Sequence, residues 1–263
     1  MALIVIPARY QSSRFPGKPL VALTGATGVK STLIERSWTA AKSVPGGHKV
    51  VVSTDDDRIA DAARAFGAEV VMTSDQCRNG TERCAETAKT LGYDGVVVNL
   101  QGDAPLTPPW FVSALIDHMD NSDAPVATPV LRCDPMALNG FLEDRQNGRV
   151  GATTAVFDKA GRALYFSKEV LPYTGRRFAD DETCPVFHHV GVYAYRADVL
   201  DLYSGWDEGT LEGWEGLEQL RFMENGVAVS CVEVDARGRQ FWELNNPIDV
   251  DRLETIMREQ NIA

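Results

Sequence analysis

Residues 3–20 read LIVIPARYQSSRFPGKPL, and this stretch decides the class of fold. Leu3–Pro7 is a short β-rich run, and the polar loop that follows it at once holds Arg9, Arg14 and Lys18. Backbone amides and cations gathered in one loop can bind the oxygens of a triphosphate. Three cations within ten residues of an acidic chain favour such a site over a solvated loop with scattered charges.

Beyond this stretch, apolar runs alternate with helical patterns along the first hundred residues. The runs are too apolar for a half-exposed sheet, so we expect an α/β fold of Rossmann-like type with mostly parallel strands covered on both faces. Ligands bind at the carboxyl ends of such strands. The expected strands are Leu3–Pro7, Lys49–Ser53, Glu69–Met72 and Gly95–Leu100, and the expected helices start at Ser31 and cover Asp56–Phe66 and Glu82–Leu91.

The pattern changes in the second half of the chain, where polar and aromatic residues alternate with apolar ones. This alternation predicts antiparallel ribbons inserted into the α/β frame at about residues 150–215, within a single domain covering residues 1–263. The expected ribbons are Val150–Phe157, Ala163–Phe166 and His189–Tyr195. The remaining predictions are a helix over Leu211–Asn225, a strand over Val227–Val234, and a helix over Ile248–Met257 that Asn246 caps and Pro247 begins.

Composition excludes several classes of protein. The 263 residues include 26 Lys and Arg against 37 Asp and Glu, and the net charge of −11 argues against a protein that coats nucleic acid. The five cysteines form no CxxC pair, which favours free thiols in a reducing cytoplasm. The chain shows neither a signal-peptide pattern nor an apolar run long enough to span a membrane. We therefore expect a cytoplasmic protein without membrane or nucleic-acid partners.

Three short motifs lie where ligands are expected. Asn99–Pro105, NLQGDAP, ends the fourth strand, so Asp103 is placed to hold Mg²⁺ and Gln101 to contact a base or ribose; an Asp in a simple β-turn is the alternative. Asn79–Arg83, NGTER, can expose backbone groups to a base, or begin a helix with Thr81 as its cap. Gly25–Thr32, GATGVKST, lacks the Gly-Lys step of a P-loop, and we interpret it as a polar loop before the Ser31 helix.

A fourth group combines His188, His189 and Tyr193 on an expected strand with two residues of an expected helix. If residues 189–193 form one strand, His189 and Tyr193 face the same side across Gly191 and leave room for a polar ligand. Glu218 and Gln219 lie on the expected helix. Taken singly, each of these residues also fits an ordinary role in a core or on a solvated face.

Together these segments resemble the CMP-Kdo synthetases, the 3-deoxy-manno-octulosonate cytidylyltransferases. The likeness runs over nearly the whole chain and includes IPARYQSSRFPGKPL, NGTER, VNLQGDAP, ALYFSKEVLP, HHVGVYAYR and LEGWEGLEQLR. It implies a nucleotidyltransferase sheet with an inserted antiparallel dimerisation and sugar-binding region. It also implies a homodimer that uses Mg²⁺ to transfer CMP from CTP to the anomeric hydroxyl of Kdo, a step of lipopolysaccharide biosynthesis, with release of pyrophosphate.

The resemblance also implies two sets of residues: a nucleotide set, which would bind CTP, and an acceptor set, which would bind the sugar acid. Arg9, Arg14 and Lys18 of the nucleotide set, together with the metal ligand Asp103, would carry most of the catalysis by holding charge in place. The whole nucleotide set comprises Arg9, Ser13, Arg14 and Lys18 around the triphosphate and Gly80, Thr81, Arg83 and Gln101 around the cytidine. The acceptor set comprises Lys168, His189, Tyr193, Glu218 and Gln219, and the metal ligands would be Asp103 and Asn245.

Two departures from the family pattern keep alternatives open. Ala104 stands where the family usually has Glu, and Asn245 stands where it has a metal-binding Asp. An amide oxygen can bind Mg²⁺ but removes one negative charge, so we expect weaker metal binding. The alternatives are a cytidylyltransferase for another acidic acceptor, such as a phosphonate, and a nucleotide-binding relative with weakened catalysis. A dehydrogenase is disfavoured because the chain has no GxGxxG motif.

Overall fold

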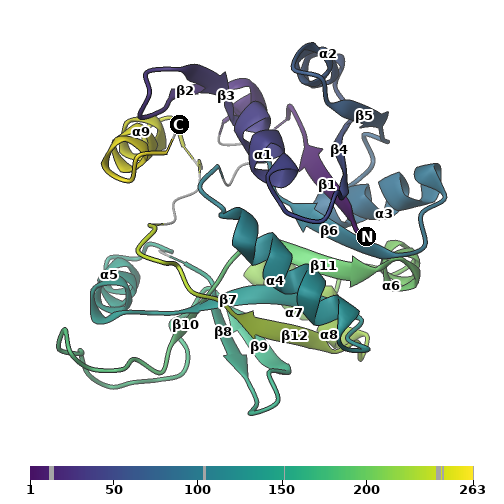
Figure 1. The fold of residues 1–263 in the computed structure, drawn as a ribbon. Coiled ribbons are helices and arrows are strands. Elements are labelled where there is room, and N and C mark those ends of the chain that lie inside the picture. Colours follow the sequence, from purple (N-terminus) through teal and green to yellow (C-terminus); the bar gives the residue numbers. More distant parts are fainter. Residues whose placement is uncertain (12–14, 103–104, 151, 241–243, 245, 263) are drawn as a thin grey trace.

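The computed structural model describes residues 1–11, 15–102, 105–150, 152–240, 244 and 246–262. Its strands are β1 (Leu3–Ala8), β2 (Ala22–Thr24), β3 (Lys30–Thr32), β4 (Lys49–Thr54), β5 (Glu69–Met72), β6 (Val96–Leu100), β7 (Val126–Arg132), β8 (Thr154–Phe157), β9 (Ala163–Ser167), β10 (Phe187–His189), β11 (Val192–Arg196) and β12 (Val229–Glu233). Ten of them form one sheet in the order β5-β4-β1-β6-β11-β7-β10-β8-β9, with β12 paired to β7 (Figure 1). The other two, β2 and β3, form a separate hairpin.

Helices cover the sheet and connect its strands. They are the 3₁₀ helix η1 (Lys18–Leu20) and the α-helices α1 (Leu33–Lys42), α2 (Asp57–Ala65), α3 (Gly80–Leu91), α4 (Pro109–Asp120), α5 (Pro135–Gln146), α6 (Ala197–Ser204), α7 (Thr210–Glu215), α8 (Leu220–Glu224) and α9 (Asp249–Glu259). Strands β5, β4, β1 and β6 pair in parallel, whereas β11 is antiparallel to both β6 and β7. The expected α/β class, a parallel sheet joined to antiparallel strands, is confirmed.

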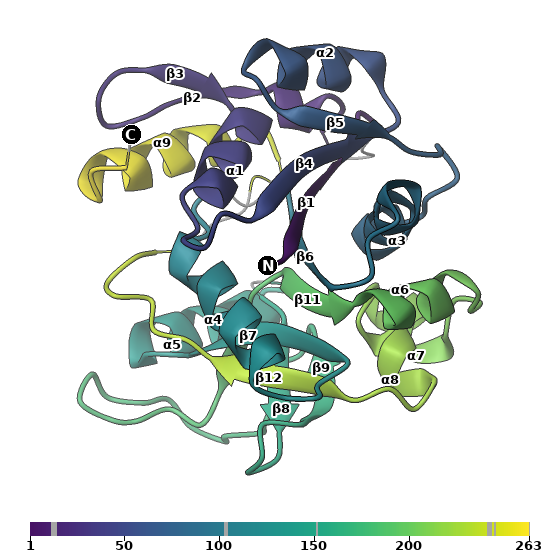
Figure 2. The same ribbon diagram turned by 45° about the vertical axis from the view of Figure 1, so that its right-hand side comes forward.

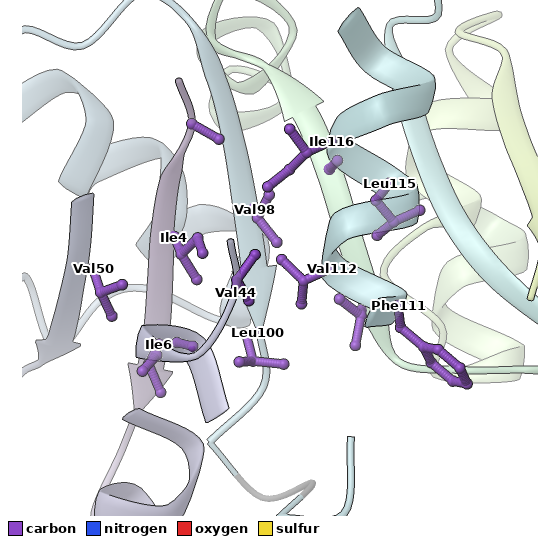
Figure 3. Packing of buried hydrophobic residues seen from close by; sticks show 14 of the residues in the cluster. Ile4, Ile6, Val44, Val50, Val98, Leu100, Phe111, Val112, Leu115 and Ile116 are labelled. Carbon is purple, nitrogen blue, oxygen red and sulfur yellow. The ribbon is translucent and has the colours of Figure 1, made fainter. Parts of the chain in front are cut away.

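The parallel half of the sheet is buried on both faces. Along β1, Ile4 and Ile6 point into one apolar cluster, whereas Leu3 and Val5 point into another, as the two-residue period of a strand requires. Helix α4 packs on the first face, where Val112 and its neighbours meet strand β6 (Figure 3). Helices α3 and α6 contribute to the second cluster. This burial leaves the strand ends as the places where polar groups can gather.

Several elements are not predicted from the sequence. They are the helices η1, α4, α5 and α6 and the strands β2, β3 and β7. In α4 the buried side chains of Phe111, Val112, Leu115, Ile116 and Met119 do recur at helical spacing. Its signal was therefore present, immediately behind the proline-rich segment that ends at Pro109.

The prediction of one continuous strand over His189–Tyr195 is wrong. The structure has two strands, β10 and β11, separated at Val190 and Gly191. Ala194 lies opposite Ala127 of β7, which would place Gly191 opposite Val130 in an unbroken strand; His189 lies there instead. The register therefore shifts by two residues, and β8 pairs with β10 while β6 pairs with β11.

The prediction of one helix over Leu211–Asn225 is also wrong. Helix α7 ends at Gly216, which has φ of +61°, a left-handed conformation that glycine adopts without a steric cost. Helix α8 then starts only at Leu220. Residues 217–219, which include Glu218 and Gln219, form the connection between the two helices instead of a helical face.

Helix entries also differ from the predictions. The side chain of Asn79, and not Thr81, caps α3 by accepting a hydrogen bond from the Glu82 amide. Asn246 does not cap α9 with its side chain; its backbone amide donates to Asp249 instead. Gly25–Thr32 includes β3, and α1 starts at Leu33 with Thr32 as its cap.

A small apolar cluster connects the C-terminal helix α9 with the β2–β3 hairpin and the start of α1. Leu23 and Leu33 pack against Leu253, Ile256 and Met257 of α9. Leu106 and Leu244 complete the cluster. The Thr24 amide donates to Glu254 Oε1 over 2.7 Å and the Ala26 amide to the Ile262 carbonyl over 2.7 Å, so α9 is fastened to the hairpin (Figure 2).

Two expectations from composition can be compared with the fold. The five cysteines are free thiols. Within the described ranges, no helix is both long enough and apolar enough to span a lipid bilayer. The predicted bounds of the inserted region stay a prediction; strands β8, β9 and β10 from that part of the chain extend the same sheet.

The central cluster predicts a clear difference between two leucines on helices. Leu115 of α4 is fully buried, whereas Leu202 of α6 is 55% exposed. We expect Leu115→Ala to lower the free energy of unfolding by about 2–5 kcal/mol through lost burial and a residual cavity. Leu202→Ala should change it by less than about 0.5 kcal/mol. Urea denaturation of both variants measures this, and similar values for the two would contradict the packing described here.

Candidate active site

The ends of β1 and β6 meet the first turn of α3 at very close range. A Cβ atom on Gly80 would lie 3.1 Å from Asn99 Nδ2 and 3.3 Å from Gln101 Nε2. A Cβ atom on Gly102 would lie 3.0 Å from the carbonyl oxygen of Pro7. A side chain at Gly102 would press on the backbone of β1, and one at Gly80 would displace the side chains of Asn99 and Gln101 by a few tenths of an ångström. The two glycines therefore allow the strand ends and the helix N-terminus to lie this close together.

The first turn of α3 connects this meeting point to strand β11. The Thr81 side chain is fully buried, and its Oγ1 lies 2.8 Å from the hydroxyl of Tyr195. Asn99 Nδ2 donates to the same hydroxyl over 3.4 Å. Tyr195 therefore fixes both the α3 turn and the end of β6, although it was not among the residues predicted from sequence.

The carboxylate of Glu218 lies at the N-terminus of α3. Its Oε2 accepts from the Thr81 amide over 3.1 Å, and its Oε1 accepts from Gln101 Nε2 over 3.0 Å. A helix N-terminus favours a negative charge because its first amides are unpaired and its dipole is positive there. Glu218, which was expected in the acceptor set, therefore contacts two residues of the expected nucleotide set.

Burial nevertheless raises the pKa of Glu218 above its ordinary value. The hydrogen bonds from the Thr81 amide and hydroxyl and from Gln101 act in the opposite direction, and the negative charge of Glu212 adds to the increase. The desolvation cost outweighs the bonds. The site thus contains a carboxylate whose charged form is only partly compensated.

His189, Tyr193 and Gln219 form a second group beside Glu218. The Tyr193 hydroxyl donates to Gln219 Oε1 over 3.0 Å, and the rings of His189 and Tyr193 lie 5.5 Å apart. Gln219 is 1% exposed, and its Nε2 has no hydrogen-bond partner among the described residues. The expected proximity of the two rings is therefore observed, although the two residues stand on separate strands.

His189 is held as a neutral ring. Its Nε2 lies 2.9 Å from Thr128 Oγ1, and burial, with a smaller effect of His188, lowers its pKa to about 3. A neutral imidazole can donate or accept a hydrogen bond but supplies no positive charge near pH 7. Adjacent His188 packs edge-on against Phe141, 5.5 Å away, and has no place in this group.

Lys168 follows strand β9 and reaches the connection between α7 and α8. Its backbone amide donates to Glu215 Oε2 over 2.9 Å. Its Nζ lies 2.9 Å from the position that a Cβ atom on Gly216 would take. The ammonium group therefore lies beside Gly216, which precedes Glu218 by two residues in the sequence. The place of Lys168 in the acceptor set stays a prediction.

The loop after β1 is described only at its two ends. Arg9 is exposed directly after the strand, and Lys18 begins η1. The Gly17 amide donates to the Tyr10 carbonyl over 2.8 Å and so closes the loop, with Gly17 at φ of +72°. Ser13 and Arg14 lie outside the described residues, so their predicted contacts with a triphosphate stay predictions.

Arg83 points to a different part of the structure from Gly80 and Thr81. It is 3% exposed, donates to Thr73 Oγ1, and has its Nη2 3.4 Å from Asp55 Oδ1. These contacts tie α3 to the ends of β4 and β5. The structure thus gives Arg83 protein partners, and its predicted contact with a cytidine stays a prediction.

The two predicted metal ligands, Asp103 and Asn245, lie outside the described residues. Gly102 and Leu244 directly precede them and are both buried. The part of the chain that is described contains no group of three or more His, Cys, Asp or Glu arranged to hold a metal ion. A carboxylate and an amide oxygen are donors that suit Mg²⁺ in chemical type.

Comparisons with known proteins decide the family. Residues 3–233 match the family model described as Cytidylyltransferase. The chain is 44% identical over 257 residues to the 3-deoxy-manno-octulosonate cytidylyltransferase of Maricaulis maris, covering 97% of this chain and 96% of that protein. It is 37% identical to the mitochondrial 3-deoxy-manno-octulosonate cytidylyltransferase of Arabidopsis thaliana, covering 98% and 84%. The chain belongs to the cytidylyltransferase family.

A solved structure agrees with this assignment. CMP:2-keto-3-deoxy-manno-octonic acid synthetase complexed with CTP superposes with a TM-score of 0.81 at 34% identity, covering 98% of this chain and 99% of that one. A cytidylyltransferase from Leptospira borgpetersenii, at 15% identity and a TM-score of 0.58, shares the fold. The resemblance stated from sequence is thus confirmed.

The candidate site contains residues that were not predicted from the sequence. Four residues hold the predicted site residues in place through hydrogen bonds: Asn79, Tyr195, Tyr203 and Arg221. Asn79 was recognisable, because Asn before Gly at the start of a helical pattern is a preferred cap. The other three gave no signal, since a buried Tyr or Arg looks like an ordinary helix or strand residue until its partners are known.

The raised pKa of Glu218 predicts how stability changes with pH. A carboxyl group with a higher pKa in the folded than in the unfolded chain favours the folded state only while it is protonated, so its ionisation destabilises the fold as pH rises above the usual value of 4.5. We expect Glu218→Gln to raise the thermal midpoint at pH 7, with a gain that shrinks toward pH 4. Thermal denaturation between pH 4 and pH 8 measures it.

Glu82 is the matched control with the opposite sign. Burial alone raises the pKa of Glu82, but hydrogen bonds from Arg78 and Arg221 outweigh it and leave the pKa below the usual value. Glu82→Gln should therefore lower the midpoint at pH 7, and the loss should diminish as pH falls below 4.5. The same sign for both variants at pH 7 would be incompatible with this electrostatic description.

Proposed function

We propose that this protein transfers CMP from CTP to 3-deoxy-manno-octulosonate (Kdo) and releases pyrophosphate. The relatives with this activity in their names match the chain at 37–44% identity over nearly its full length. The observation that carries the proposal is the 3.0 Å hydrogen bond between Gln101 and Glu218. It joins the nucleotide set to the acceptor set, as a reaction between a nucleotide and a sugar acid requires.

In the transfer, the anomeric hydroxyl oxygen of Kdo forms a bond to the α-phosphorus of CTP. The bond from that phosphorus to the oxygen of the β-phosphate breaks, pyrophosphate leaves with the electron pair, and the hydroxyl proton passes to solvent. The protein's contribution is mainly to hold the two reactants in line and to neutralise charge. Arg9, Arg14 and Lys18 bind the triphosphate in this proposal.

The acceptor set recognises Kdo through one cation and several neutral groups. Lys168 supplies the positive charge for the sugar acid's carboxylate, because His189 is neutral. Tyr193 offers a hydroxyl to the sugar hydroxyls, and Gln219 offers an amide nitrogen that has no partner in the described part of the chain. Hydrogen bonds from a site to substrate hydroxyls discriminate strongly, because an analogue without them leaves buried polar groups unpaired.

Mg²⁺ is part of the proposal, with Asp103 and Asn245 as the residues that would hold it. When bound, the ion would neutralise phosphate charge and polarise the reacting phosphoryl group. A cytoplasmic location accords with five free thiols. A homodimer through the inserted region accords with the exposed apolar side chains of Leu164 and Tyr173, which are 54% and 92% exposed.

Pyrophosphate release with a panel of acceptors tests the function. We expect release from CTP with Kdo, and mass spectrometry of the product should find CMP joined to the sugar acid. A reaction without acceptor is the control. Release of pyrophosphate only with a phosphonate would show that the protein is a cytidylyltransferase for another acidic acceptor. Binding of CTP in calorimetry, without release under any condition, would show that it is a nucleotide-binding relative with weakened catalysis.

The metal proposal predicts the effect of restoring a carboxylate. Asn245→Asp adds one negative charge to the proposed ligand set, so half-maximal activity should require less Mg²⁺, by roughly threefold or more. Titration of activity with Mg²⁺ and calorimetric titration of the metal into the CTP complex both measure this. Asn246→Asp, one position along, is the control for a general charge effect; an equal gain there, or no gain in Asn245→Asp, would refute the assignment.

A further inference from the structure

We propose that Arg221 is a positioning residue that holds Glu218 and Gln219 in place for the acceptor. The inference rests on the proposed function, since it concerns the same site. The side chain of Arg221 contacts no described member of the nucleotide set or of the acceptor set. It acts through a buried ionic cluster, defined here as Arg221, Glu212 and Glu82, which lies behind the α7–α8 connection.

One guanidinium group joins three helices. Arg221 of α8 is 1% exposed, and its Nε and Nη2 donate to the two carboxylate oxygens of Glu212 on α7, each over 2.6 Å. Its Nη1 donates to Glu82 Oε1 in the first turn of α3 over 2.9 Å. A fork of this kind fixes direction as well as distance, because each donor has a set orientation.

The cluster reaches Glu218 through Tyr203 of α6. The guanidinium carbon of Arg221 lies 4.3 Å from the centre of the Tyr203 ring. The Tyr203 hydroxyl donates to the Glu218 carbonyl over 3.2 Å and accepts from Asn79 Nδ2 over 2.9 Å. The Arg221 amide donates to the same carbonyl over 3.3 Å. The backbone of Glu218 is thus tied to both the cluster and the cap of α3.

These contacts decide the position of the connection because its own helices are short. Helix α7 has six residues and α8 has five, and isolated helices of that length are not stable in water. Figure 2 shows α6, α7 and α8 gathered on the α3 side of the sheet. Without the guanidinium, the buried carboxylate of Glu212 would lose its ionic partner, and Glu82 would keep only its bond to Arg78. The α7–α8 segment would then be free to move away from α3.

The nucleotide set touches the cluster through Glu82 and contacts Glu218, but it also has supports of its own. Gly80 and Thr81 belong to α3, which has 12 residues and its own cap at Asn79. Gln101 follows β6 in the centre of the sheet. A disturbance at Arg221 should therefore affect binding of the acceptor and leave binding of CTP nearly unchanged.

The test is a comparison of Michaelis constants in Arg221→Lys and Glu212→Gln. We expect the KM for Kdo to rise about tenfold or more in both, and the KM for CTP to change less than about twofold. Lysine keeps the charge but cannot bind Glu212 with a fork, so Arg221→Lys should be milder than Arg221→Met. If Arg221→Met fails to fold, the other two variants still decide.

Arg196→Lys is the matched control. Arg196 donates to the carbonyls of Met119, Ser122 and Ala124 and so fixes the loop between α4 and β7, which contains none of the site residues. This variant should lose thermal stability with both KM values unchanged. Equal increases of both KM values in the Arg221 variants, or lower stability without any change in KM, would overturn the positioning role.

Amide hydrogen exchange gives a readout that does not need turnover. We expect residues 216–224 to exchange faster in Arg221→Lys than in the unaltered protein, with residues 83–91 of α3 unchanged. Unaltered exchange at residues 216–224 would contradict the inference by itself. Absence of pyrophosphate release from CTP and Kdo in the unaltered protein would instead refute the proposed function, so the two failures are distinguishable.

Discussion

The close approach of three backbone segments is the constraint on which the site depends. The ends of β1 and β6 and the first turn of α3 meet at Gly80 and Gly102, where a Cβ atom would lie 3.0–3.1 Å from its neighbours. This contact brings the unpaired amides of the helix to the carboxyl ends of the parallel strands, the usual location of ligands in such sheets. Glu218, Gln101 and the acceptor residues are arranged around that point.

The site also combines groups that stability alone would not select. Glu218 has a raised pKa, Gln219 Nε2 and Asn99 Oδ1 have no hydrogen-bond partner among the described residues, and the Arg221 cluster is buried. Buried polar groups of this kind lower the stability of a fold unless they are paired. Their concentration in one region is typical of a binding site, where a ligand supplies the missing partners.

Most strands of the parallel half of the sheet were predictable, whereas the breaks inside elements of the second half were not, for physical reasons. Strands β1, β4, β5 and β6 are short apolar runs bounded by polar loops, which is typical of buried strands. In contrast, the break between β10 and β11 depends on how β7 pairs, and the break between α7 and α8 depends on a glycine with positive φ. Local pattern shows neither.

The same distinction applies to the site residues. Two motifs were found from their places in the predicted fold. The motif that contains Gly80 begins a predicted helix, and the motif that contains Gln101 ends a predicted strand. Glu218 and Gln219 were assigned to a helical face by local period, and only the resemblance to the family placed them in the acceptor set. Tyr195 and Arg221 were missed because their importance comes from contacts across long sequence separations, such as the bond from Arg221 to Glu82.

The neutral ring of His189 has a consequence for catalysis at different acidities. A group with a pKa of about 3 does not change its charge between pH 5 and pH 9. Any bend of a rate profile within that range must therefore come from other groups, such as the nucleotide's phosphates, the sugar acid or Glu218. Between pH 5 and pH 9 the imidazole of His189 stays uncharged and contributes to the site through its shape.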